Sequence, residues 1–99
     1  MNMQALMRQA QTMQKDMLKA KDEIDKMIFN GHSSLVTVTL NGKKDVQKVE
    51  ITNKDEIEKE DLEVLEDMIV VAMNDALQQV DKETEQKMGK YANAMPGLF

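Results

Sequence analysis

The chain has 99 residues and a mass of 11.3 kDa, which fits a single domain spanning 1–99. It has no cysteine, and this excludes disulfides, thiolate metal sites and a cysteine nucleophile. The net charge is −5, yet residues 1–21 carry four cations against one acid, while residues 50–85 carry thirteen acids against three cations. No apolar run is long enough for a signal core or a membrane span, so we expect a soluble, cytoplasmic protein without membrane contact.

An apolar stripe dominates the first quarter of the chain. Its members recur at alternating spacings of three and four residues, a heptad pattern that predicts one long helix. Such a helix would be roughly 37 Å long, whereas a compact domain of this size has a radius of gyration of about 13 Å. The helix must therefore project from the body or pair with another helix. The stripe consists of Met3, Leu6, Ala10, Met13, Met17, Ala20, Ile24 and Met27.

Two strands are predicted next in the chain. Residues Leu35–Leu40 alternate with period two and are rich in β-branched side chains, and Val46–Ile51 can return beside them. Asn41 and Gly42 are typical of the positive φ angles in a tight hairpin turn. The apolar residues of both strands share a face only if the connection holds an even number of residues, either Asn41-Gly42 or Asn41–Lys44.

A third strand is also predicted, because two strands alone are marginal in water. Ile28–Asn30 can supply it, joined to the next strand through the turn-forming residues Gly31–Ser34. The sheet is therefore expected to be small and antiparallel, with two or three strands.

A second long helix follows a polar segment at residues 52–60. Apolar residues return at helical spacing from Leu62 to Val80. The acidic run from Asp55 to Asp67 is interpreted as a solvated linker and helix start, with an acidic binding tail as the alternative. Pro96 cannot continue a helix, so Met95–Phe99 is read as a separate apolar tail. The fold class is α+β: long N-terminal helix, small antiparallel sheet, long C-terminal helix.

The apolar surface of two long helices exceeds what one small sheet can cover. A symmetric homodimer is the commonest way to cover such a surface, and the heptad stripe is the surface we expect two copies to share. The alternative is a monomer in which the two helices pack together across one face of the sheet.

The residues that could support catalysis are few. His32 lies beside Ser33 and Ser34, but turn chemistry before a strand explains this segment more simply than an activated serine does. The acidic run lacks the glycine and ligand spacing of a calcium loop, and the four glycines form no phosphate-binding motif. We therefore predict that the protein is not an enzyme and has no metal, cofactor or small-molecule substrate.

A cationic ridge lies opposite the apolar stripe of the first helix. Arg8, Lys15, Lys19 and Lys26 are separated by 7, 4 and 7 residues, so they share one face, with Gln4 and Gln11 beside them. Lys and Arg neutralise phosphates, and Gln can bond sugar, phosphate or base edges. The same pattern also describes any solvated face of a bundle helix.

Four segments, in order, resemble the bacterial YbaB/EbfC family of nucleoid-associated proteins. They are the Met- and Gln-rich opening Met3–Met17, the stretch Leu35–Gly42 with its return Val49–Ile51, the helical stretch Leu65–Ala76, and the tail Pro96–Phe99. The resemblance covers essentially the whole chain. It implies a tweezer-like homodimer whose long helices grip duplex DNA.

The resemblance also implies a cytoplasmic protein of the nucleoid that influences nucleoid organisation and gene expression. We expect low or modest sequence preference, and binding that salt weakens strongly because the total charge is acidic. The predicted DNA-binding residues are Arg8, Lys15, Lys19, Gln4 and Gln11, with Lys87 and Lys90 near the end of the second helix. The alternative is an acidic, Met-rich protein-interaction adaptor that does not bind DNA and whose partner association tolerates salt.

Overall fold

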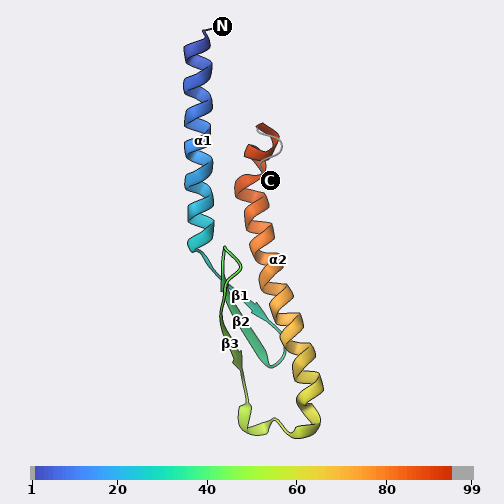
Figure 1. Cartoon of the computed structure of the whole chain (residues 1–99). Helices are drawn as coiled ribbons and strands as arrows, with labels where there is room; N and C mark the ends of the chain where they lie inside the picture. Colours follow the sequence, from blue (N-terminus) through green and yellow to red (C-terminus); the bar gives the residue numbers. More distant parts are fainter. Residues whose placement is uncertain (1, 95–99) are drawn as a thin grey trace.

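The computed structural model describes residues 2–94, and it consists of two long helices joined by a small sheet (Figure 1). The α+β class is confirmed, and the third strand is present. The apolar tail predicted at Met95–Phe99 lies outside the described residues. In chain order the elements are α1 (Met3–Lys26), β1 (Ile28–His32), β2 (Val36–Asn41), β3 (Val46–Ile51), the 3₁₀ turns η1 (Lys54–Glu56) and η2 (Lys59–Asp61), and α2 (Leu62–Ala94).

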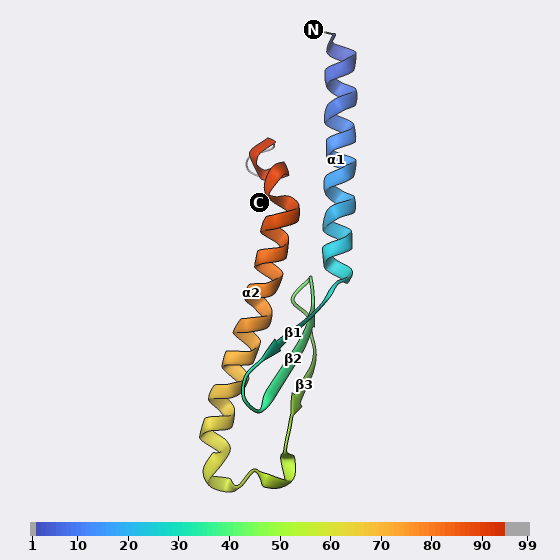
Figure 2. The ribbon, with the colours of Figure 1, turned by 180° about the vertical axis from the view of Figure 1, so that it is seen from behind.

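The three strands form an antiparallel sheet in the order β1-β2-β3. Val36 lies opposite Ile51, and Val38 lies opposite Val49, so the apolar residues of β2 and β3 share a face as predicted. Phe29 of β1 lies opposite Leu40 and adds to the same face. Helix α2 runs along this face of the sheet in both views of the ribbon (Figures 1 and 2).

The hairpin between β2 and β3 differs from the prediction. Its left-handed residue is Lys44, with φ 70°, rather than Asn41 or Gly42. The N–H of Asn41 donates to the carbonyl oxygen of Asp45 (3.1 Å), so the loop between them spans Gly42–Lys44. The ladder shifts register by one residue between Thr39 and Leu40, and this shift compensates for the odd loop. The prediction of two or four residues in this loop assumed that the strands pair regularly, without a bulge.

Strand β1 is longer than predicted, because Gly31 and His32 belong to it rather than to a turn. Gly31 is buried where α2 crosses, and a Cβ there would overlap the carbonyl oxygen of Ala72 and the amide nitrogen of Ala76. The carboxylate of Asp75 accepts the N–H of His32 (2.9 Å), and the side-chain amide of Gln79 donates to the carbonyl oxygen of Asn30 (2.8 Å). Polar groups of α2 therefore satisfy the backbone of β1 and extend the strand.

The main core lies between the sheet and α2. Val36, Val38 and Leu40 are at most 1% exposed, and they pack in one cluster with residues of α2. Small residues at the crossing let the helix approach the strands closely. The α2 side of this core consists of Ala72, Ala76 and Val80, flanked by Leu65, Met68, Ile69, Met73 and Leu77.

A second, smaller cluster joins the two helices. Ile24 of α1 packs with Met88 and Tyr91 of α2, and Met13, Met17 and Ala20 flank them. The heptad stripe from Met13 onward is thus covered within one chain. In contrast, Met3 and Leu6 at its start are 73% and 41% exposed. The first part of the stripe is therefore the most exposed, and a seam shared between two copies stays a prediction.

The described part of the chain is elongated. Its radius of gyration is 19.5 Å and its principal extents are 70 × 19 × 14 Å, against a radius of gyration of about 13 Å for a compact domain of 100 residues. Helix α1 extends past the described part of α2 in both views (Figures 1 and 2). The first helix therefore both pairs with α2 and projects beyond it.

Candidate nucleic-acid interface

Helix α1 forms the projecting arm of the molecule. Its 24 residues contain no Gly or Pro and are mostly Met, Gln, Lys and Ala, which are good helix formers. Asn2 caps the helix, because its side-chain oxygen accepts the N–H of Gln4 (3.0 Å). The arm is thus a regular rod that holds its side chains at fixed angular positions.

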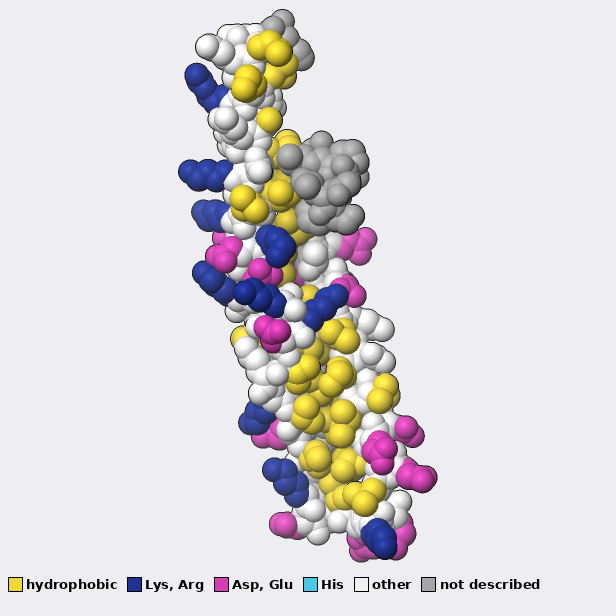
Figure 3. All heavy atoms as spheres, in the orientation of Figure 1, with side chains coloured by type: hydrophobic (Ala, Val, Ile, Leu, Met, Phe, Trp, Pro, Cys, Tyr) yellow, Lys and Arg dark blue, Asp and Glu magenta, His cyan; other side chains and the backbone are white. Residues whose placement is uncertain are grey.

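Arg8, Lys15 and Lys19 form a ridge on this rod, which we call the arm ridge. All three are exposed, and no carboxylate within residues 2–94 lies in ion-pair distance of any of them. The ridge spans 11 residues, or about 16 Å. Basic side chains project in a row along the edge of α1 in Figure 3. Gln4 and Gln11 lie beside the ridge and are exposed.

Lys26 is the fourth cation of the predicted face, and it differs from the other three because it is paired with an acid. Its Nζ lies 2.9 Å from a carboxylate oxygen of Asp22, one turn earlier. The hydrogen bond and the charge of Asp22 raise the pKa of Lys26 above its ordinary value. Lys21 is similarly paired with Asp25 at 3.4 Å. Within residues 2–94, the cations at the base of the arm are therefore paired with acids, whereas the cations of the arm ridge are not.

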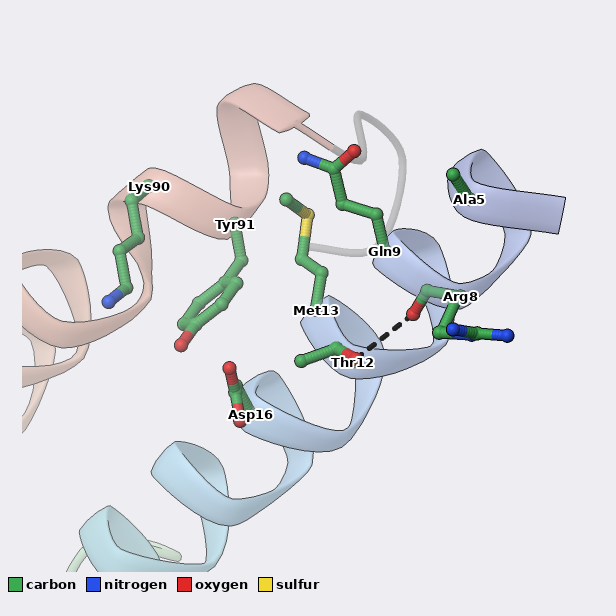
Figure 4. Close-up of a pocket in the computed structure, with 8 residues that line it drawn as sticks. All are labelled: Ala5, Arg8, Gln9, Thr12, Met13, Asp16, Lys90 and Tyr91. Atoms are coloured by element: carbon green, nitrogen blue, oxygen red, sulfur yellow. Dashed lines mark hydrogen bonds between the residues drawn. The ribbon is translucent and has the colours of Figure 1, made fainter. Parts of the chain in front are cut away.

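The two predicted cations of α2 differ in position and contacts. The Nζ of Lys87 lies 3.3 Å from a carboxylate oxygen of Glu83 and 3.7 Å from the sulfur of Met27, so this cation is engaged at the base of α1. Lys90 lies with its Nζ 5.0 Å from the ring centre of Tyr91. Lys90 and Arg8 line the same groove between the helices (Figure 4). The structure thus brings Lys90, but not Lys87, near the arm ridge.

The acidic run lies at the other end of the molecule. Residues 55–67 form η1, η2 and the start of α2, and all are exposed except the half-buried Ile57 and Leu65. In Figure 3 acidic side chains lie at the sheet end and also around the base of α1, but not at the outer end of the arm. The acidic run and the arm ridge are therefore separated along the long axis of the molecule. Exposed charges farther apart than the Debye length, about 8 Å at physiological ionic strength, are largely screened from each other, so the acidic run only weakly affects the arm ridge.

The segment with His32 and Ser33 has a structural role. The hydroxyl of Ser33 donates to the carbonyl oxygen of Met68 (2.8 Å), which ties the β1–β2 turn to α2. The His32 ring has its Nδ1 3.2 Å from the hydroxyl of Thr37 on the neighbouring strand. In residues 2–94, no group of three His, Cys, Asp or Glu side chains is arranged to hold a metal ion. None of the described helices has an apolar stretch of the length that crosses a membrane.

An exposed apolar surface beside β3 was missed by the sequence reasoning. Val46 and Val49 share the core face of the sheet, yet they are 48% and 43% exposed. Val70 on α2 is also exposed, and Met73 and Leu77 follow it at helical spacing. Hydrophobic side chains form a continuous area over the sheet end in Figure 3. Periodicity identified this face of β3 as apolar, but it could not show that α2 packs mainly over β1 and β2.

The fold and the charge pattern define a small α+β protein with a helical arm, whose ridge cations pair with no acid in the described part of the chain. The sequence model described as the YbaB/EbfC DNA-binding family matches residues 1–95. The chain therefore belongs to the YbaB/EbfC DNA-binding family.

Relatives in three organisms match nearly the full length of the chain, and each is named a nucleoid-associated protein. The relative in Lactococcus lactis subsp. cremoris is 46% identical, over 97% of this chain and 98% of its own length. The relative in Enterococcus faecalis is 41% identical, over 98% and 94%. The relative in Ligilactobacillus salivarius is 39% identical, over 99% and 95%.

Proposed function

We propose that the protein binds duplex DNA as a homodimer, with the arm ridge of each copy contacting phosphates. The observation that carries this proposal is the ridge itself: Arg8, Lys15 and Lys19 are exposed and aligned, and no acid of the described chain pairs with them. Membership of a DNA-binding family supports duplex DNA as the phosphate-bearing partner of this ridge. Gln4, Gln11 and Lys90 flank the contact, and Lys87 contributes less because Glu83 already pairs with it.

Phosphate contacts explain low or modest sequence preference. Lys and Arg contacts to phosphate position a protein on DNA without reading base edges. A ridge of about 16 Å covers roughly half of a helical turn of DNA, which is about 34–36 Å. Two arms together can therefore follow one stretch of duplex from both sides, as in the tweezer-like arrangement expected for the family.

The apolar surface beside β3 is the dimer surface in this proposal. It consists of Val46, Val49, Ile51, Val70, Met73 and Leu77, and we call it the β3 patch. β3 is an edge strand, and exposed apolar edges of this kind are normally covered. A two-fold contact through the same patch on both copies closes the assembly. It also leaves both arm ridges free, because the patch lies at the sheet end of the molecule.

We infer a cytoplasmic location at the nucleoid from the names of the relatives. A dimer that grips DNA with little sequence preference would occupy many chromosomal sites. Its effect on nucleoid organisation and gene expression would follow from this broad occupancy.

The DNA contact is tested by charge reversal on the ridge. The double variant Lys15→Glu with Lys19→Glu should abolish the gel shift of a duplex at low salt. The matched control is Lys54→Glu with Lys59→Glu, which makes the same change in net charge at the acidic end. Six phosphate contacts in the dimer give a slope of about −5 for log affinity against log salt. Equal loss in both double variants, or a slope near zero in the unmodified protein, would contradict the assignment to the arm ridge.

The dimer surface is tested separately, by analytical ultracentrifugation without DNA. Val49→Glu places a charge in the β3 patch and should give a monomer. Val71→Glu is the control, because Val71 is 56% exposed but lies on the outer side of α2. If the Val49→Glu variant is still a dimer, the dimer contact lies on another surface. The exposed start of the heptad stripe would then be the next surface to test.

A further inference from the structure

The first ten residues of α1 lack support from the rest of the described chain. The cluster that joins the helices begins at Met13, and within residues 3–12 every side chain is exposed. Residues 3–12 extend a helix that is already formed at residues 13–26, but most helical stability in proteins comes from tertiary packing, which this end lacks. Met3 and Leu6 also present apolar surface there. This stretch is therefore the part of α1 that would gain most from a further contact.

A groove lies beside part of this stretch, on a side of α1 that does not include Met3 and Leu6. It has a volume of about 620 Å³ and runs between the outer part of α1 and the end of α2. Gln9, Thr12 and Met13 form one wall, and Tyr91 faces them from the other helix (Figure 4). Ala5, Arg8, Asp16 and Lys90 complete the lining. The groove combines an aromatic ring and a thioether with polar groups at its margins, which suits an apolar peptide segment.

We propose that the chain's own segment Met95–Phe99 binds in this groove and ties α2 to the outer part of α1. Three of its five residues are apolar: Met95, Leu98 and Phe99. Proline cannot continue a helix and favours an extended residue before it, so the sequence of this segment suits a chain that turns away from α2. Gly97 then permits a change of direction towards α1.

The length of the segment Met95–Phe99 is consistent with this proposal. The described part of α2 ends at Ala94, one turn beyond the groove residue Tyr91. Five extended residues reach at most about 17 Å. The unsupported stretch from Met13 back to Met3 rises about 15 Å along α1. The segment is therefore comparable in length to the exposed stretch of α1.

Disulfide trapping tests the proposal, because the chain has no cysteine of its own. The variant Gln9→Cys with Leu98→Cys should oxidise rapidly to a disulfide within one chain. The matched control is Gln14→Cys with Leu98→Cys, since Gln14 is equally exposed but lies on the other side of α1. We expect the Gln9 pair to form at least tenfold faster than the control pair. The products are separated by non-reducing electrophoresis and located by peptide mass analysis.

Equal rates for the two pairs would overturn the proposal, because they would show a segment without a preferred position. Disulfides formed mainly between two chains would also overturn it, since the groove would then hold the segment of a second copy. A further measurement uses Leu98→Asp with Phe99→Asp. This variant should increase amide hydrogen exchange at least tenfold in residues 3–12 while leaving β2 unchanged, and unchanged exchange in α1 would count against the proposal. All of these experiments are done without DNA, so their failure would leave the proposed DNA binding untouched.

Discussion

The sheet end and the arm end of this molecule are built in different ways. At the sheet end, Val36, Val38 and Leu40 are almost completely buried beneath α2. At the arm end, the helices meet through a small cluster around Ile24, Met88 and Tyr91, and the outer part of α1 is exposed. The fold therefore depends mainly on the sheet and α2, whereas the arm is free to carry charge. Substitutions at the sheet end should therefore affect stability more than substitutions in the arm.

The largest effect is expected at Gly31. In Gly31→Val, the new side chain would collide with the backbone of α2 at Ala72 and Ala76. Overpacking typically costs about 1–3 kcal/mol, and the clash with backbone places this variant at or above the upper end. Urea denaturation should show a loss of about 3 kcal/mol or more, or no folded protein at all.

Gly89→Ala is the matched control for Gly31→Val. Gly89 lies within α2, and a Cβ there meets nothing within 4 Å in the described structure. Replacing a helical glycine by alanine stabilises by about 0.5–1 kcal/mol. If both variants lost stability equally, the close approach of β1 and α2 would not be what requires glycine at position 31.

The next largest effect is expected in the main core, and a substitution in the cluster between the two helices provides the comparison. Leu40→Ala removes a fully buried side chain from the main core and should cost about 2–5 kcal/mol in the free energy of unfolding. Met17→Ala removes a half-buried side chain from the cluster between the helices, and should cost less than half as much. Chemical denaturation measures both, and far-UV circular dichroism checks that each variant is folded. Equal losses would show that the arm is as tightly built as the sheet end.

Most of the fold could be predicted from the sequence because its periodicities are long and uninterrupted. The stripe from Met3 to Met27 and the alternation in Leu35–Leu40 each specify one type of element. The alternation also identifies the buried face of its strand, whereas the stripe is buried or half-buried only from Met13 onward. The extension of β1 through Gly31 could not be predicted in this way. Gly31 has the composition of a turn, but its burial against α2 and the bonds from Asp75 and Gln79 arise only from tertiary packing.

The candidate site could be predicted only in part. Spacing alone placed Arg8, Lys15 and Lys19 on one face of a helix, and the structure shows them there, exposed. The i,i+4 spacing of Asp22 with Lys26, and of Glu83 with Lys87, is a sequence signal that could have indicated these two ion pairs. Spacing could not show that Lys87 also contacts Met27, or that Lys90 lies at the groove, because these contacts depend on how the two helices pack. Which of these residues contact DNA stays a prediction.

A smaller effect is expected at the start of the arm. Asn2→Ala removes the side-chain oxygen that caps α1 at the N–H of Gln4. Loss of such a cap costs about 1 kcal/mol of helix stability. Because the outer arm has few other contacts, the change should appear as faster amide hydrogen exchange in the first turns of α1, with little change in global unfolding. Asn2→Asp should keep the protection, and an equal increase in both variants would show that the cap is not responsible.

The smallest effect is expected at Asp22, where the balanced base of the arm meets the charged outer part. Asp22→Asn removes the group that raises the pKa of Lys26, so this pKa should fall towards its ordinary value of 10.5. A raised pKa in the folded state stabilises the protein below the unfolded value, and the contribution is lost as the pH rises through the folded value. At pH 7 Lys26 is charged in both forms, and its exposure keeps the change in stability small. Titration of the Lys26 side chain by NMR measures the shift.

The same substitution changes the DNA contact, because it releases Lys26 in line with Lys19 and Arg8. If the freed cation gains one phosphate in each copy, the salt slope becomes steeper by about 2. Affinity at low salt should then increase, although Asp22 itself touches no part of the proposed contact. Asp25→Asn is the control, since it releases Lys21, which lies off the line of the ridge. Equal steepening by both variants would mean that DNA responds to the total charge of the arm rather than to cations aligned on one face.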